Sequence, residues 1–179
     1  MTGKRKSPRW KDYDYSRDNI YFITICVKQM ICCFGRVVPV VTEGYDSLNA
    51  GNDPPDLEGY EMKLNHYGKI AEKQWLWLGK RFSYVKLHAH IIMPNHVHGI
   101  IEIDRSLAIN NKIKIKSVVE LIGVFKTTSS KQIHLAGYND FKWHRSFYDR
   151  IIRNEKSLNN VINYILNNPR NWVMDNNKK

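Results

Sequence analysis

The sequence of 179 residues is 42% hydrophobic and 12% aromatic, which is typical of one globular domain with its own core and excludes a disordered chain. No apolar run reaches the length of a transmembrane helix, so we expect none, and the charged start of the chain lacks the apolar stretch of a secretory signal. Cys26, Cys32 and Cys33 are an odd number of cysteines without CxxC spacing, which favours the reducing cytoplasm over a disulfide framework. The adjacent Cys32 and Cys33 leave a metal or redox site open.

The formal net charge is +11, and the positive charge is concentrated near both ends of the sequence. Residues 1–17 carry six Lys or Arg against two acids, residues 18–111 carry nine against ten, and residues 112–179 carry thirteen against five. Four aromatic residues lie among the last group: Trp143, Phe147, Tyr148 and Trp172. A solvated basic face would explain the charge alone, but clustered cations interleaved with rings that can stack on bases favour a nucleic acid partner.

Hydrophobic patterning predicts seven elements. In chain order they are a strand at 20–28, a helix from Asn65 to about Gly79, strands at 82–92 and 96–103, a helix from Ser117 to about Leu135, a strand at 146–154, and a helix from Glu155 to Asn168 that Pro169 ends. Prolines and glycines between residues 36 and 62 predict a surface loop insertion, which we place at 39–59.

The order of the first six elements is strand, helix, strand, strand, helix, strand. This order predicts an α+β fold of the ferredoxin-like, split βαβ type, with a four-stranded antiparallel sheet and a further C-terminal helix. We expect one domain over residues 1–179, in which residues 1–17 form a basic arm. Two helices should cover one face of the sheet.

Two histidines one residue apart, His96 and His98, lie in the alternating segment MPNHVHGIIEI (93–103). Side chains alternate along a strand, so both imidazoles share one face and can hold one divalent cation. A chance pairing explains the same pattern. His88 and His90 form a second pair of this spacing in the preceding apolar run, and spacing alone does not choose between the two pairs.

Tyr164 and Asn168 lie four residues apart in the last predicted helix, so their side chains share a face that differs from its main apolar stripe. This pair could line a cleft. A half-buried core tyrosine followed by a capping asparagine would give the same pattern. A second tyrosine near the C-terminus, Tyr148, lies in a predicted strand beside Asp149 and Arg150 and competes for the role of a nucleophile.

Six segments in the same order carry a resemblance to a known family. They are DYDYSRDNIYFITIC (12–26), CFG (33–35), LNHYGKIAEKQW (64–75), IIMPNHVHGII (91–101), GVFKT (123–127) and WHRSFYDRIIRNEKSLNNVINYILNNPRNW (143–172). Together they resemble the REP-associated tyrosine transposases, a branch of the HUH single-tyrosine transposases, over nearly the whole chain. A lone HxH is a weak motif, but MPNHVHG followed by SFYDRIIRNE and YILNNP is specific.

The resemblance implies roles for particular residues. It makes His96 and His98 the HUH pair that binds Mg²⁺ or Mn²⁺, Tyr164 the catalytic nucleophile, and Asn168 a third metal ligand. It gives no role to His88 or His90, and His90 departs from the apolar or aromatic residue that the family usually has there.

The implied activity is metal-dependent cleavage and rejoining of single-stranded DNA near hairpins through a 5′-phosphotyrosine. We expect these residues to contact DNA: Lys4, Arg5, Lys6, Arg9, Lys126, Arg145, Arg150 and Arg153. A catalytically vestigial regulator that binds hairpin DNA is the alternative. A replication or conjugation initiator of the wider HUH group would need a helicase or primase domain, for which this chain has no room. The sequence does not decide between a monomer and a homodimer.

Overall fold

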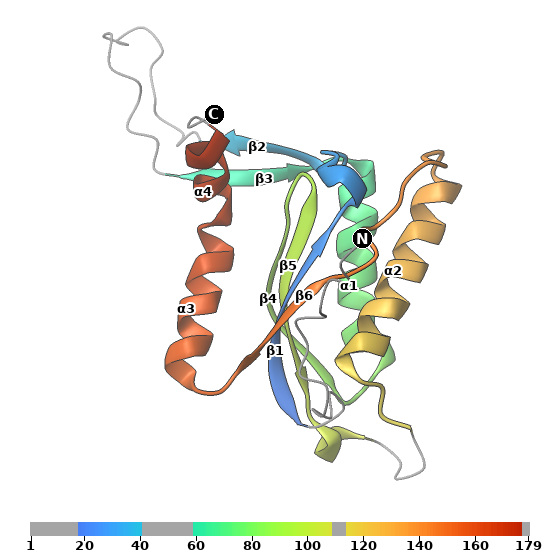
Figure 1. Cartoon of the computed structure of the whole chain (residues 1–179), viewed down its shortest axis with the longest axis vertical. Helices are drawn as coiled ribbons and strands as arrows, with labels where there is room; N and C mark the ends of the chain where they lie inside the picture. Colours follow the sequence, from blue (N-terminus) through green and yellow to red (C-terminus); the bar gives the residue numbers. More distant parts are fainter. Residues whose placement is uncertain (1–17, 41–58, 109–113, 177–179) are drawn as a thin grey trace, which may run out of the picture.

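The centre of the molecule is a four-stranded antiparallel sheet with the order β4-β5-β1-β6 (Figure 1). The computed structural model describes residues 18–40, 59–108 and 114–176. The strands are β1 (Asn19–Cys26), β4 (Val85–Ile92), β5 (His96–Ile103) and β6 (Tyr148–Ile152). Because β1 and β5 are central and every neighbouring pair is antiparallel, the prediction of a ferredoxin-like α+β fold is confirmed.

Helices cover both faces of this sheet, with α1 and α2 on one face and α3 on the other (Figure 1). Their bounds are α1 (His66–Arg81), α2 (Val118–Leu135), α3 (Glu155–Leu166) and α4 (Asn168–Asn176). The side chains of Asn65, Ser117 and Asn154 cap α1, α2 and α3, and Glu120 completes a capping box with Ser117. Short 3₁₀ turns, η1 (Lys28–Met30) and η3 (Arg105–Leu107), follow β1 and β5.

Alternate residues of the two central strands enter two separate cores. The larger core, against α1 and α2, takes Tyr21, Ile23, Ile25, Val97 and Ile101 from the sheet. The smaller core, against α3, is formed by Phe22, Ile100, Ile152 and Ile165. In the β1–β5 ladder, His98 pairs with Thr24 and His96 pairs with Cys26, so both histidines lie on the α3 face, as the alternation predicted.

Gly99 determines how closely α1 approaches β5. The Trp75 ring of α1, which is fully buried, lies directly over this glycine. A Cβ atom at position 99 would be 2.2 Å from Cζ2 of Trp75, closer than any real contact. The residue between His98 and Ile100 therefore has to be a glycine for Trp75 to pack behind the histidine strand.

A two-stranded antiparallel sheet, β2 (Gly35–Pro39) and β3 (Tyr60–Leu64), was not predicted. These strands flank the predicted loop at 39–59, of which residues 41–58 lie outside the described part of the chain. Each strand has five residues with no buried position, so the hydrophobic signal of a strand is weak there. Helix α4 contacts this small sheet and thereby fixes the end of the chain that follows Tyr164.

The prediction of one helix from Glu155 to Asn168 is wrong at its C-terminal end. Helix α3 ends at Leu166, Asn167 caps it, and Asn168 begins α4. Pro169 does not terminate the helical region, because it occupies the first turn of α4, where a missing N–H costs no hydrogen bond. In the described ranges, no helix is long and apolar enough to cross a membrane.

Candidate active site

The two histidines of β5 face each other on the α3 side of the sheet. Their ring centroids are 4.5 Å apart and the rings are inclined by 72°. Only 5% of the His98 side chain is exposed, and its ring stacks on Phe22 with a centroid distance of 5.3 Å. The ladder between β1 and β5 therefore holds the two imidazoles side by side on one face of the sheet.

Hydrogen bonds at Nδ1 fix the orientation of both rings. Nδ1 of His96 lies 2.7 Å from Oδ1 of Asn95, and Nδ1 of His98 lies 2.9 Å from the Thr24 hydroxyl. The Asn95 amide is itself oriented, because its Nδ2 donates to the Met30 carbonyl at 3.1 Å. With the amide oxygen turned to His96, that ring carries its proton on Nδ1 and leaves the Nε2 lone pair for a ligand.

The hydroxyl of Tyr164 lies 3.4 Å from Nε2 of His98. The two rings meet with a centroid distance of 5.3 Å, and the Phe22 ring packs edge-on against Tyr164 at 6.0 Å. Tyr164 is nevertheless 45% exposed, so the residue is accessible from solvent. Helix α3 thus brings a tyrosine hydroxyl close to Nε2 of a buried histidine.

Asn168 approaches the other histidine. Asn168 is 5% exposed and lies close enough to His96 to raise the pKa of that imidazole. Trp172, one turn further along α4, lies 5.9 Å from the His96 ring between centroids. Because the helix breaks between α3 and α4, Tyr164 of α3 lies near His98 while Asn168 of α4 lies near His96.

Both imidazoles are neutral at physiological pH. Burial lowers the pKa of His96 to about 4, and the Asn168 hydrogen bond opposes this only in part. Burial, together with the neighbouring His96, lowers the pKa of His98 to about 3. A neutral imidazole is the form that binds a metal ion.

The donor set fits a divalent cation. The two imidazole rings lie 4.5 Å apart between centroids with Asn168 beside His96, and nitrogen with oxygen ligands suits Mn²⁺ as well as Mg²⁺. Among the described residues there is no cluster of three or more His, Cys, Asp or Glu side chains that could hold a metal ion. Asn168, which the family resemblance implied as a third ligand, lies beside His96 and stays a prediction.

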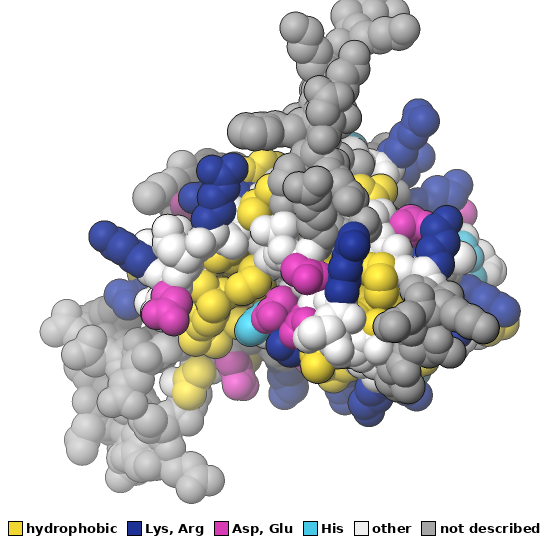
Figure 2. Space-filling model, turned by 90° about the horizontal axis from the view of Figure 1, so that it is seen from below, with side chains coloured by type: hydrophobic (Ala, Val, Ile, Leu, Met, Phe, Trp, Pro, Cys, Tyr) yellow, Lys and Arg dark blue, Asp and Glu magenta, His cyan; other side chains and the backbone are white. Residues whose placement is uncertain are grey.

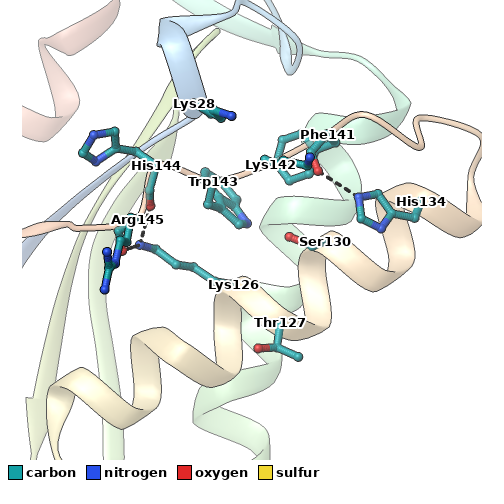
Figure 3. Close-up of a pocket in the computed structure, with 10 residues that line it drawn as sticks. All are labelled: Lys28, Lys126, Thr127, Ser130, His134, Phe141, Lys142, Trp143, His144 and Arg145. Atoms are coloured by element: carbon teal, nitrogen blue, oxygen red, sulfur yellow. Dashed lines mark hydrogen bonds between the residues drawn. The ribbon is translucent and has the colours of Figure 1, made fainter.

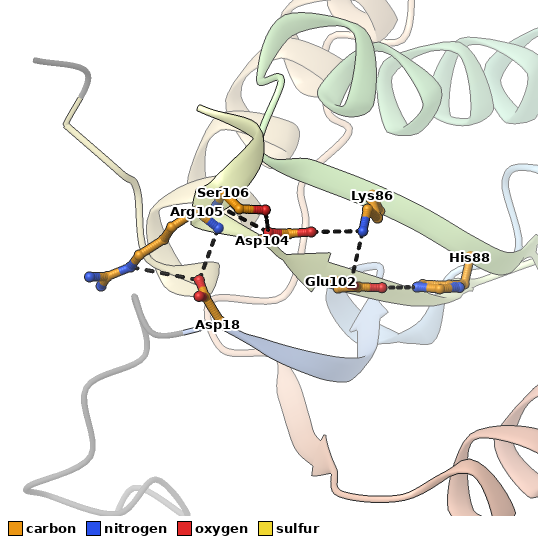
Figure 4. A network of polar contacts seen from close by, with 7 residues as sticks. All are labelled: Asp18, Lys86, His88, Glu102, Asp104, Arg105 and Ser106. Atoms are coloured by element: carbon orange, nitrogen blue, oxygen red, sulfur yellow. Dashed lines mark hydrogen bonds and ion pairs between the residues drawn. The ribbon is translucent and has the colours of Figure 1, made fainter. Parts of the chain in front are cut away.

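The second histidine pair does not form a site. A β-bulge in β4 between Leu87 and His90 shifts the register against β5. His88 bonds to Glu102, with 2.6 Å between Nε2 and Oε2 (Figure 4), while the His90 ring lies 6.3 Å from the Trp75 ring, on the α1 face of the sheet. These histidines point to opposite faces and cannot hold one ion.

Other residues considered from the sequence lie away from the two histidine rings. Tyr148 pairs with Thr24 in the β1–β6 ladder and is 51% exposed, without a hydrogen bond to either histidine in the described structure. All three cysteines are free thiols, and burial raises the pKa of Cys33 to about 12, which disfavours its reactive thiolate at neutral pH.

The residues predicted to contact DNA differ in their exposure and in their hydrogen-bond partners. Arg145, Arg150 and Arg153 are exposed, and Arg150 pairs with Phe22 in the ladder, which places it on the histidine face. The Lys126 ammonium donates to the carbonyls of residues 144, 145 and 146, at 2.9, 3.3 and 3.1 Å. Lys4, Arg5, Lys6 and Arg9 lie outside the described residues.

Sequence reasoning missed the residues that orient the histidines. Thr24 and Asn95 carry no signal of their own as single polar residues. Asn95 directly precedes His96, and Thr24 lies at an alternate position of the predicted first strand, but their role depends on strand register.

No family model matches this sequence. The chain is 29% identical over 184 residues to an uncharacterised protein of Haemophilus influenzae, a match that covers 96% of this chain and 91% of that protein. Among solved structures, it is similar to a REP-associated tyrosine transposase bound to a REP hairpin, with a TM-score of 0.52 and 13% identity over 96% of this chain and 74% of the other. A candidate transposase from Deinococcus radiodurans R1 matches with a TM-score of 0.41 and 14% identity, over 90% and 97%. This chain has the fold of a REP-associated tyrosine transposase.

Proposed function

We propose that this protein is a metal-dependent transposase that cleaves and rejoins single-stranded DNA near hairpins, with Tyr164 as the nucleophile. The observation that carries the proposal is the Tyr164 hydroxyl 3.4 Å from Nε2 of His98, beside a second buried and neutral histidine. The likeness in fold to a transposase bound to a REP hairpin supports hairpin DNA as the substrate. The free cysteines fit action in the reducing cytoplasm.

The chemistry follows from the residues at the centre. A divalent cation held by His96, His98 and Asn168 would neutralise charge on the scissile phosphate. The Tyr164 oxygen attacks phosphorus, the bond from phosphorus to the 3′ oxygen breaks, and the products are a 5′-phosphotyrosine and a free 3′-OH. The hydroxyl proton leaves to solvent, to which Tyr164 is 45% exposed, and the departing 3′ oxygen takes up a proton from solvent to become the 3′-OH. Because the phosphodiester is kept in the intermediate, a different 3′-OH can reverse the step and rejoin the strand.

Two tyrosine variants test the nucleophile. Tyr164→Phe should form no covalent adduct with a hairpin oligonucleotide in Mn²⁺ and should still bind that DNA, because affinity comes mainly from cations. Tyr148→Phe should keep the adduct. Denaturing gels detect the adduct and mass spectrometry of the trapped peptide locates it. DNA attached to Tyr148 would overturn both this assignment and the role of Asn168.

Histidine variants test the metal centre in the same assay. His96→Ala and His98→Ala should abolish the adduct and retain hairpin binding, whereas His88→Ala should leave cleavage nearly unchanged. An inactive His88→Ala would mean that the wrong histidine pair has been assigned. If the intact protein binds hairpin DNA tightly but forms no adduct with any divalent cation, a DNA-binding regulator with vestigial machinery becomes the better description.

A further inference from the structure

A pocket of about 290 Å³ lies one strand away from the two histidines and is not used by the chemistry above. Thr24, Cys26 and Tyr148 line it on the histidine face of the sheet. Thr24 and Cys26 are the ladder partners of His98 and His96, so the pocket begins about 5 Å, one strand spacing, from the histidine strand. The Tyr148 ring at its edge is 51% exposed.

A second, larger cavity of about 640 Å³ adjoins this pocket, since His144 lines both (Figure 3). Its lining includes four cations, Lys28, Lys126, Lys142 and Arg145, and no acidic residue. Lys28, Lys142 and Arg145 are exposed and make no ion pair with any described acid. We call this second cavity the basic groove.

The wall between the pocket and the basic groove is held in place by Lys126. Its ammonium donates to three carbonyls of residues 144–146 and lies 5.4 Å from the Phe147 ring centroid. The same segment pairs with the end of β1, where Lys28 N–H donates to the Lys142 carbonyl at 2.9 Å and His144 N–H donates to the Cys26 carbonyl at 2.8 Å. Two lysines are therefore fixed side by side on paired backbones.

The opposite end of the sheet carries a cluster of acidic residues. Glu102 and Asp104 share Lys86, and Asp18 lies 3.8 Å from Arg105, all at the start of β1 and the end of β5 (Figure 4). Figure 2 shows this end of the molecule, with acidic side chains gathered near its middle. At about 3.3 Å per residue, six residues from His98 to Asp104 span roughly 20 Å. A polyanion that leaves the histidines is therefore attracted toward the basic groove and repelled at the other end.

From this arrangement we infer that the unpaired DNA strand flanking the cleavage point runs from the histidines through the pocket into the basic groove. An unpaired base stacks on the Tyr148 ring, and the following phosphates contact Lys28, Lys142 and Arg145. The inference rests on the proposed function and adds the path of the substrate. An exposed ring beside free cations suits a single strand, because a paired base has no free face to stack. Lys126 positions this path rather than contacting the DNA.

Binding of short oligonucleotides in EDTA tests the groove without cleavage. The variant is Lys28→Gln with Lys142→Gln, and the matched control is Lys69→Gln with Lys73→Gln, two exposed lysines of α1 outside the groove lining. With an unpaired oligonucleotide, the slope of log affinity against log salt should decrease in magnitude by about 1.4 in the groove variant, at about 0.7 per lost phosphate contact, and stay unchanged in the control. Equal slopes in the two variants would overturn the inference.

The proposed stacking of a base on Tyr148 is tested by base fluorescence. A 2-aminopurine base in the flank of a hairpin oligonucleotide should be quenched by the intact protein and by Tyr148→Phe, but not by Tyr148→Ala, which should also bind the flanked hairpin about fivefold to 150-fold more weakly. A hairpin without a flank should bind all three proteins equally. If that hairpin loses as much affinity, the groove takes duplex DNA and the inference is wrong.

The two proposals fail in different ways. If the Tyr164 adduct forms but the groove variant binds the unpaired strand like the intact protein, only the path is wrong. If no adduct forms but the groove variant loses unpaired-strand binding as expected, the catalytic proposal fails and the groove remains a single-strand binding site.

Discussion

At the scale of single residues, the orientation of the histidine rings depends on the polar side chains that hydrogen bond to their Nδ1 atoms. Asn95 is 6% exposed and joins two elements, since its oxygen faces His96 and its nitrogen donates to the Met30 carbonyl. Met30 and its neighbour Gln29 both have positive φ, of 56° and 59°, which is strained for residues other than glycine. A strained turn that places one carbonyl under Asn95 is consistent with a requirement for the His96 orientation.

Asn95→Ala should therefore weaken metal binding. The substitution removes the acceptor for Nδ1–H of His96, and loss of such a partner typically costs 10- to 100-fold in metal affinity. Calorimetric titration of the DNA-free protein with Mn²⁺ measures this directly. His88→Ala serves as the control, because Glu102, the partner of His88, still forms its ion pair with Lys86 after the substitution. Equal Mn²⁺ affinity of the Asn95 variant and the intact protein would exclude the positioning role.

The two depressed histidine pKa values predict how the metal-free protein responds to acid. The folded protein holds His96 and His98 neutral down to about pH 4 and 3, whereas unfolded histidines take up protons near pH 6.5. The unfolded state binds more protons in this window, so the free energy of unfolding falls as the pH is lowered from about 6.5 toward 3. Urea unfolding in EDTA at pH 7, 5.5 and 4.5 should show this decline. His98→Asn should reduce its slope, and an identical slope would contradict the burial argument.

At the scale of the elements, the site depends on how three packed segments meet. Helix α1 packs against β5 through the contact of Trp75 with Gly99. On the other face of the sheet, α3 positions Tyr164 near His98, and α4 places Asn168 beside His96. The described core around α3 is small compared with the core under α1 and α2. A helix held by a small core could move with the DNA end that the proposed function attaches to Tyr164.

Gly99→Ala tests the contact between α1 and β5. The new Cβ would be 2.2 Å from Cζ2 of Trp75, so the ring must shift, and overpacking of this kind typically costs about 1–3 kcal/mol. Gly123→Ala is a matched control, because that glycine is exposed in α2 with nothing within 4 Å of a new Cβ, and the change should stabilise by about 0.5–1 kcal/mol. Chemical unfolding measures both. Equal stability of the two variants would mean that Trp75 relaxes without cost.

At the scale of the whole molecule, charge and the candidate catalytic residues are distributed along the same axis. The strand pair β1–β5 has carboxylates at one end and the histidines with the basic groove at the other. In a protein with a net charge of +11, this polarity would attract the proposed DNA substrate to one end of the sheet. The basic segment at residues 1–17 lies outside the described structure, so its contribution is a prediction from sequence.

Deleting residues 1–9 should reduce the salt dependence of hairpin binding. The deletion removes Lys4, Arg5, Lys6 and Arg9, and each phosphate contact with single-stranded DNA contributes about 0.7 to the slope. Fluorescence anisotropy over a salt series gives the slope. A full-length variant with these four residues changed to Gln should behave like the deletion if charge alone is responsible. An unchanged slope in both would show that this segment does not touch the DNA.

The sequence by itself determined the sheet, its order of elements and the face shared by His96 and His98, because alternation of apolar residues is a local property of a strand. It could not separate the two histidine pairs from spacing alone, since the bulge that turns His88 and His90 apart depends on register with β5. It also missed β2, β3 and the break after Leu166, which depend on the packing of α4 against the small sheet. The approach of Tyr164 to His98, the support by Thr24 and Asn95, and the basic groove join residues far apart in sequence, so only tertiary packing decided them.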